Sequence, residues 1–189
     1  MIYQSGQQGL IWSAQASLRN LQKGLAGKIA MEKDILIEYF KRSYFALDGL
    51  WFTMLEEEFS FDKALEIDEK VWRILPKIQA RKVKDLLGLK GIGLADFRRA
   101  IKVKLEAEGY EYQENELGSH HIQIIIHSCP WYNILKKTNR EHLEPQIADA
   151  ICSLEFQVWL KEFGEGLNFR FEPRHCAGEP ICRLDFRAT

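Results

Sequence analysis

Apolar residues in the first half of the chain recur every three or four positions, which is the spacing of amphipathic helices. Residues 34–59 predict one long helix with a single buried stripe: Ile35, Tyr39, Phe40, Tyr44, Leu47, Leu50, Trp51, Met54 and Leu55. A second helix is predicted over 61–89, capped by Ser60 and bent at Pro76, because proline lacks a backbone donor. A third follows over 94–109 and ends at Gly109.

The pattern changes to alternation after residue 110. "YEYQENELGSHHIQIIIHSC" predicts two strands, with Ile122, Ile124 and Ile126 on one face of the second strand. Two helices are expected over 130–141 and 144–164, and a closing hairpin over 167–188. The sequence therefore predicts an α+β fold, in which a layer of three helices precedes β-β-α-α-β-β with a four-stranded antiparallel sheet.

The chain has 189 residues, enough for one domain with a substantial core. We expect this α+β domain over 31–189, with a helical part at 31–109 and a sheet-containing part at 110–189. Residues 1–30 contain no acidic side chain and keep no long helical register. They are interpreted as an extension or an over-extended start, the alternative being a genuine N-terminal helix.

Charge and hydropathy narrow the function classes. The chain has 26 basic and 27 acidic residues and a net charge of −1, which argues against nucleic acid as a partner. The longest apolar run, "IQIII", is too short to cross a bilayer, and the start does not resemble a secretory signal. The expected location is the cytoplasm, where the cysteines stay reduced and no membrane is involved.

All four cysteines fall in the last third of the chain, at Cys129, Cys152, Cys176 and Cys182. They contain no C-x2-C pair, so the spacing matches no standard zinc motif. If the fold gathers them, they form either a thiol nucleophile with helpers or a site for zinc or iron. The alternative is that they are small buried core residues.

Other polar residues suggest partners for these thiols. His127 and Cys129 are two apart on a predicted strand, so their side chains are expected on one face, where an imidazole can activate a thiol. Two guanidinium groups suit a carboxylate-bearing ligand. The predicted substrate-binding residues are Arg170, Arg183, Gln123 and Asp48. The alternative for the arginines is cross-strand ion pairing, for example between Arg183 and Glu172.

Four stretches support a family resemblance: "LDGLWFTMLEEEFSFDKALEIDEKVW", "IQARKVKDLLGL", "HSCPW" and "PRHCAGEPICRLDF". They resemble uncharacterised prokaryotic proteins related to L-2-amino-thiazoline-4-carboxylic acid hydrolase. The cysteine-containing hairpin is also distantly similar to 4-vinyl reductase-type domains, which are thought to bind small molecules. The likeness runs from about Met31 to the end of the chain.

The resemblance implies a small-molecule-binding protein, and a cysteine-dependent hydrolase of a cyclic, non-peptide C–N bond in a carboxylate-bearing substrate. Cys129 would attack, and His127 would transfer the proton. The alternative is a non-catalytic sensor of a small molecule or metal. A third possibility is a structural partner that uses helix 34–59 as its interface, and a homodimer through the long helices is a related prediction.

Overall fold

A computed structural model describes residues 33–172, 174 and 178–189. The predictions about residues 1–30 concern a segment outside this described part. The chain divides into two compact units, Met1–Phe40 and Lys41–Thr189. Of the first unit, the structure describes only 33–40, which is helical; the remaining architecture belongs to the second.

The helical part contains one helix more than predicted among the described residues. Its helices are α2 Lys33–Glu58, α3 Phe61–Trp72, α4 Leu75–Leu87 and α5 Gly93–Glu108. Ser60 caps α3 as expected, its hydroxyl accepting a hydrogen bond from the Lys63 backbone N–H at 3.2 Å. The single bent helix over 61–89 was a wrong prediction. Pro76 lies in the first turn of α4, where its missing N–H costs nothing, so the chain starts a new helix instead of bending.

The prediction of a single buried stripe on α2 was also wrong. No residue of this helix is buried, and the large apolar side chains Leu47, Leu50, Trp51 and Met54 are exposed. Of the predicted stripe, Tyr44 does face inward, together with Phe45. The rings of these two residues contact Trp131 at centroid distances of 5.6 and 4.5 Å. Within the described residues, no helix combines the length and apolar character needed to cross a bilayer.

The sheet has the predicted composition. Its strands are β1 Glu111–Glu116, β2 His121–Ser128, β3 Leu167–Phe171 and β4 Cys182–Ala188. They lie in the order β1-β2-β4-β3, and every neighbouring pair is antiparallel. The fold class is therefore α+β, as the change from helical spacing to alternation predicted.

The segment between the two hairpins is helical but irregular. It consists of α6 Pro130–Lys137, η1 Glu141–Leu143, α7 Glu144–Ile147, η2 Ala148–Cys152 and α8 Ser153–Lys161. The η2 turn is a π-helix, so the long helix predicted over 144–164 is widened by one π turn in its middle. Such turns are costly and often occur beside functional sites. This one presents Cys152 to the pocket described below.

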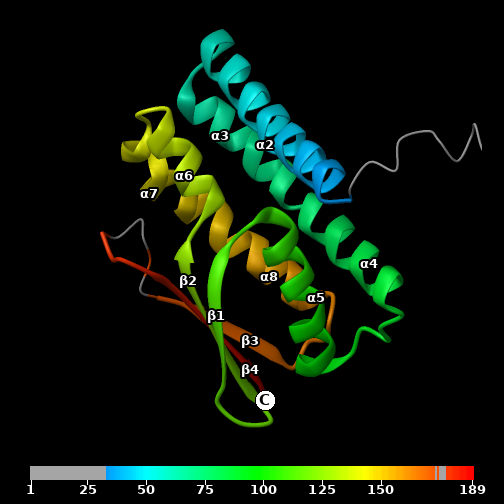
Figure 1. Cartoon of the computed structure of the whole chain (residues 1–189). Helices are drawn as coiled ribbons and strands as arrows, with labels where there is room; N and C mark the ends of the chain where they lie inside the picture. The colour runs from blue at the N-terminus through cyan, green and yellow to red at the C-terminus, as the bar shows by residue number, and fades with distance from the viewer. Residues whose placement is uncertain (1–32, 173, 175–177) are drawn as a thin grey trace, which may run out of the picture. The chain divides into compact units, whose positions relative to one another are not determined.

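One face of the sheet carries the core. Ile122, Ile124 and Ile126 are all buried, which confirms the predicted alternation. They pack with Leu184 and Phe186 of β4 in one cluster with residues of α5 and α8, the two helices that cover this face (Figure 1). Each fully buried side chain of this size contributes roughly 1.5–3 kcal/mol. The sheet is thus a rigid floor for the residues at its edge.

Candidate ligand-binding site

A pocket of about 90 Å³ lies where β2 ends and α6 begins. The three cysteines among the described residues, Cys129, Cys152 and Cys182, all line it, and we call it the thiol pocket. Aromatic rings form much of the remaining wall, contributed by Trp72, Tyr110, Trp131, Tyr132, Phe156 and Phe171. The pocket therefore unites side chains from the helical part and the sheet-containing part.

Cys129 is the N-cap residue of α6. The Tyr110 side chain and the backbone N–H groups of Trp131 and Tyr132 act to lower the pKa of its thiol. These donors favour the thiolate, but burial outweighs them and raises the pKa of Cys129 above its ordinary value. At neutral pH the sulfur is accordingly a neutral thiol, which is a poor nucleophile.

His127 is exposed and is not among the described residues that line the thiol pocket. The reason is an irregularity in the β1–β2 ladder: Tyr112 pairs with Ile126 but Glu111 pairs with Ser128, so one extra residue stands in β2. A bulge of this kind re-aims the side chains that follow it. Cys129 consequently turns toward the core side while His127 stays in solvent, and the structure does not bring the predicted pair together.

Cys152 is also a neutral thiol at neutral pH. Burial raises the pKa of Cys152 well above its ordinary value, and the neighbouring Cys129, Glu155 and Cys182 act in the same direction. Cys129, Cys152 and Cys182 are not joined in disulfides. Cys176 lies outside the described residues. Within the described part of the chain, no three His, Cys, Asp or Glu side chains are arranged to hold a metal ion. A zinc or iron site therefore remains a prediction.

Acidic side chains line the same cavity. Asp48 reaches it from α2, Asp68 from α3 and Glu144 from α7. Burial is the main cause that raises their pKa values, to about 6 for Asp48 and about 7 for Asp68 and Glu144. The charge of Asp48 further raises the pKa of Asp68. Two carboxyl groups on different helices thus lie close enough to repel each other when ionised.

Only Asp48 of these acids was predicted as a site residue. A signal for Asp68 was present, because it lies between Ala64 and Trp72 at intervals of four, and both neighbours are buried. An acid on the buried face of an amphipathic helix is unusual enough to mark a site. Glu144 carries no comparable signal, since it lies at the start of a short helix where acids are common.

A buried network of ion pairs lies beside the thiol pocket and includes Glu155 of its wall. Lys104 Nζ lies 2.7 Å from Glu108 Oε2 and 2.8 Å from Glu155 Oε1. The Trp131 indole N–H donates to the same Glu108 oxygen at 3.3 Å. Burial lowers the pKa of Lys104, but the two carboxylates outweigh it and raise that pKa above its ordinary value, so the ammonium stays charged. The ammonium group of Lys104 therefore compensates the charges of Glu108 and Glu155. Among the described residues it forms no ion pair with Asp48 or Asp68.

An open groove adjoins the thiol pocket. It has a volume of about 460 Å³ and shares four wall residues with the pocket, namely Asp48, Asp68, Trp131 and Ile147. The rest of its lining is mainly apolar and includes Phe45, Phe52, Ile134 and Leu135. We call it the helical groove. Asp48 and Asp68 lie where the helical groove joins the thiol pocket.

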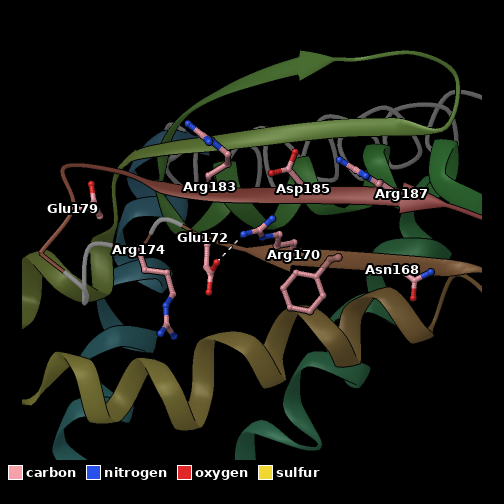
Figure 2. Close-up of a pocket in the computed structure, with 9 residues that line it drawn as sticks. Asn168, Arg170, Glu172, Arg174, Glu179, Arg183, Asp185 and Arg187 are labelled. Carbon is pink, nitrogen blue, oxygen red and sulfur yellow. Dashed lines mark hydrogen bonds and ion pairs between the residues drawn. The ribbon is translucent and has the colours of Figure 1, made fainter.

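The predicted carboxylate-binding residues lie elsewhere. Arg170 and Arg183 line a hollow of about 660 Å³ on the sheet face opposite the core, together with Asp185 and Arg187 (Figure 2). Arg170 Nη2 donates to Glu172 Oε2 at 3.0 Å, so Glu172 pairs along its own strand and not with Arg183. Gln123 on the same face donates to Asp185 at 3.1 Å. The structure brings Arg170, Arg183 and Gln123 to one face of the sheet but not to the thiols.

The fold and the cavity define an α+β protein with an acidic and aromatic internal pocket. A family profile described as "Family of unknown function (DUF6125)" matches residues 28–180, and the chain belongs to this family. A search of curated proteins found no match. Among solved structures, the chain is similar to a trafficking protein particle complex subunit 3 from Naegleria fowleri covalently bound to palmitic acid. The identity is 13% and the TM-score 0.44, over 82% of this chain and 96% of that one.

Proposed function

We propose that this protein binds a small organic cation, a protonated amine with an apolar body, at the junction of the thiol pocket and the helical groove. One observation carries the proposal. The described lining of the thiol pocket includes Asp48, Asp68, Glu144 and Glu155, but no lysine, arginine or histidine. An ammonium group placed there would relieve the repulsion between the carboxylates and would contact aromatic faces.

The sizes of the two spaces support a ligand with a charged head and an apolar body. An engineered apolar cavity of about 150 Å³ binds benzene. The 90 Å³ thiol pocket is smaller, so it suits a head group better than a whole ring. The helical groove has about five times the volume of the thiol pocket, at about 460 Å³. Its mainly apolar lining suits a hydrocarbon or aromatic body. The proposal replaces the carboxylate ligand expected from sequence, because Arg170 and Arg183 lie away from this cavity.

The proposal is tested with three molecules of one shape: phenethylamine, 2-phenylethanol and 3-phenylpropionate. We expect phenethylamine alone to raise the melting temperature and to give a saturable calorimetric titration at pH 7.5. A ligand at 100 times its Kd stabilises the folded state by about 2.7 kcal/mol, a shift of several degrees for a domain of this size. Equal or stronger stabilisation by the alcohol or the carboxylate would contradict the proposal.

The cysteine-dependent hydrolase is the second candidate. It is favoured by the position of Cys129 as the N-cap residue of α6, where the backbone N–H groups of Trp131 and Tyr132 act to lower the pKa of its thiol. The raised pKa of the thiol and the exposure of His127 favour binding over catalysis.

We therefore expect that thiazoline-type carboxylate substrates are not turned over in a Cys129-dependent way. The measurement is product formation by wild type and by Cys129→Ser, with Cys152→Ser as the matched control for loss of a pocket thiol. Turnover by wild type that disappears only in Cys129→Ser would restore the hydrolase as the leading function.

A further inference from the structure

The sheet face opposite the core carries a hollow that the proposed amine site does not use. Its volume is about 660 Å³, and every described residue of its lining belongs to β3, to β4 or to the segment between these strands. Three arginines of the lining lie on the two strands, namely Arg170, Arg183 and Arg187, and we call this set the arginine face (Figure 2). The helices α5 and α8 pack on the other side of the sheet, so neither of them covers it.

The strand register fixes how these charges are arranged. Arg170 lies opposite Asp185, so Arg183 and Arg187, two residues to either side of Asp185, are its diagonal neighbours. At about 3.4 Å per residue, the two arginines of β4 are about 14 Å apart along the strand. The arginine face therefore has a cationic group at each end of β4 and a carboxylate between them.

Arg183 is a partly buried cation for which the described chain provides no counter-ion. Its Nε atom is buried and has no hydrogen-bond partner among the described residues. Neither Arg183 nor Arg187 forms an ion pair within this part of the chain. Buried polar groups are nearly always hydrogen-bonded, and a buried charge without a partner costs free energy. The residues outside the described part contain one acidic side chain, Glu32, against three of lysine or arginine, so their composition offers little compensation.

The carboxylate of Asp185 is engaged from the neighbouring strand β2. His121 Nε2 lies 2.9 Å from Asp185 Oδ1, and the Gln123 amide donates to the same oxygen at 3.1 Å. Arg170 is turned to Glu172, at 3.0 Å, and forms no ion pair with Asp185 among the described residues. Asp185 thus stays a negative charge at the middle of the arginine face. It would repel an anionic group placed there, whereas an anionic group at either end would meet a guanidinium.

We propose that the arginine face binds an elongated dianion, a molecule with a carboxylate or phosphate at each end of an uncharged spacer. The two oxyanions would pair with Arg183 and Arg187, because a guanidinium group matches two oxygens of either group. The spacer would cross Asp185. A molecule with one anionic end compensates a single arginine, and a short dianion brings its second charge over Asp185. This site is separate from the proposed amine site and does not depend on it.

The test is calorimetric titration of the full chain at pH 7.5 with suberate, monomethyl suberate and succinate. We expect suberate to bind at least about tenfold more tightly than the other two, because its second carboxylate binds within the same complex. Arg183→Gln and Arg187→Gln should each lower the affinity for suberate by about tenfold, and added salt should also weaken it. Arg99→Gln is the matched control, because Arg99 is exposed on α5 and does not line the hollow.

Asp185→Asn tests the central charge. The amide oxygen still accepts a hydrogen bond, so the affinity for succinate should rise and the preference for suberate should shrink. The bisphosphate of 1,8-octanediol separates the two oxyanions, since tighter binding than suberate assigns phosphate and weaker binding assigns carboxylate. Three results would overturn the proposal: equal affinity for suberate and its monomethyl ester, suberate binding that both arginine variants retain, or an unchanged preference in Asp185→Asn. Circular dichroism checks that each variant is folded, and the exposed Arg187 keeps the test decisive if Arg183→Gln unfolds.

Discussion

Replacing Lys104 with methionine is expected to destabilise the protein more than any surface change, by about 3–5 kcal/mol. Lys104, Glu108 and Glu155 are 4%, 6% and 4% exposed, so water cannot replace the lost ammonium. Removing it leaves two carboxyl groups buried side by side without a counter-charge. They must then take up protons or open the core, and both cost free energy. For a domain whose total stability is about 5–15 kcal/mol, this is a large fraction.

The measurement is urea denaturation at pH 7.5, compared with Lys63→Met as the matched control. Lys63 also pairs with a glutamate, Glu66, at 2.8 Å, but both side chains are about half exposed. Exposed pairs contribute little, so the control should change stability by less than about 1 kcal/mol. Adding Glu108→Gln and Glu155→Gln to Lys104→Met should recover part of the loss. Equal stability of the two methionine variants would show that the buried network contributes nothing.

The elements that followed from sequence are those fixed by local patterns. Alternation over Ile122, Ile124 and Ile126 identified the buried face of β2, because a strand exposes every second residue to the same side. Helix α3 begins at its cap Ser60 and α5 ends at Gly109, both as expected, since capping depends on residues within one turn. Local chemistry decides these features, and the rest of the fold does not alter them.

The features that sequence did not predict depend on packing between distant segments. Helix α2 is apolar on two sides, and periodicity alone does not say which side meets the chain's own core. One extra residue beside Tyr112 turned Cys129 away from His127. The thiol pocket joins Asp48, Asp68 and Glu144, which are far apart in the chain. Of these, Asp48 was predicted from sequence, and Asp68 on the buried face of α3 carries a signal that sequence analysis can find, whereas Glu144 carries none.

Part of the buried network of Lys104, Glu108 and Glu155 can be found from the sequence. Lys104 and Glu108 are four residues apart on α5, among the buried Phe97, Ile101 and Leu105. An oppositely charged pair at this spacing inside an apolar stripe indicates a buried ion pair. Its third member, Glu155 on α8, becomes evident only when α5 and α8 pack on the same face of the sheet. The sequence thus indicates some of the residues of the site better than it indicates how they are arranged.

Asp48→Asn and Asp68→Asn are expected to make the protein more stable at pH 8 and to weaken its binding of amines. The pKa values of these carboxyl groups are raised to about 6 and about 7 in the folded state. A folded state with raised carboxyl pKa values holds more protons than the unfolded chain between about pH 4 and pH 7. The free energy of unfolding therefore falls as the pH rises through this window.

An asparagine does not ionise, so in each variant the free energy of unfolding should decrease less as the pH rises. We expect its melting temperature at pH 8 to exceed that of wild type by a few degrees, and the difference to disappear near pH 4.5. Asp85→Asn is the matched control, because Asp85 is exposed on α4 and should change neither property. A variant less stable than wild type at pH 8 would mean that the aspartates hold the pocket together by bonds that outweigh their burial.

Amine binding should depend on pH in the opposite sense to stability. The ammonium group requires ionised aspartates, so the affinity for phenethylamine should rise at least tenfold between pH 5 and pH 8, with protons released on binding. A unit charge about 4 Å away at an effective dielectric constant near 20 interacts by about 4 kcal/mol, so losing one aspartate should weaken binding by at least about tenfold. Calorimetry in buffers of different ionisation enthalpy measures both quantities. Binding that is independent of pH and retained in both asparagine variants would exclude these carboxylates as the site. Ionised aspartates that lower the stability of the folded protein are expected in a pocket that functions by binding a cation.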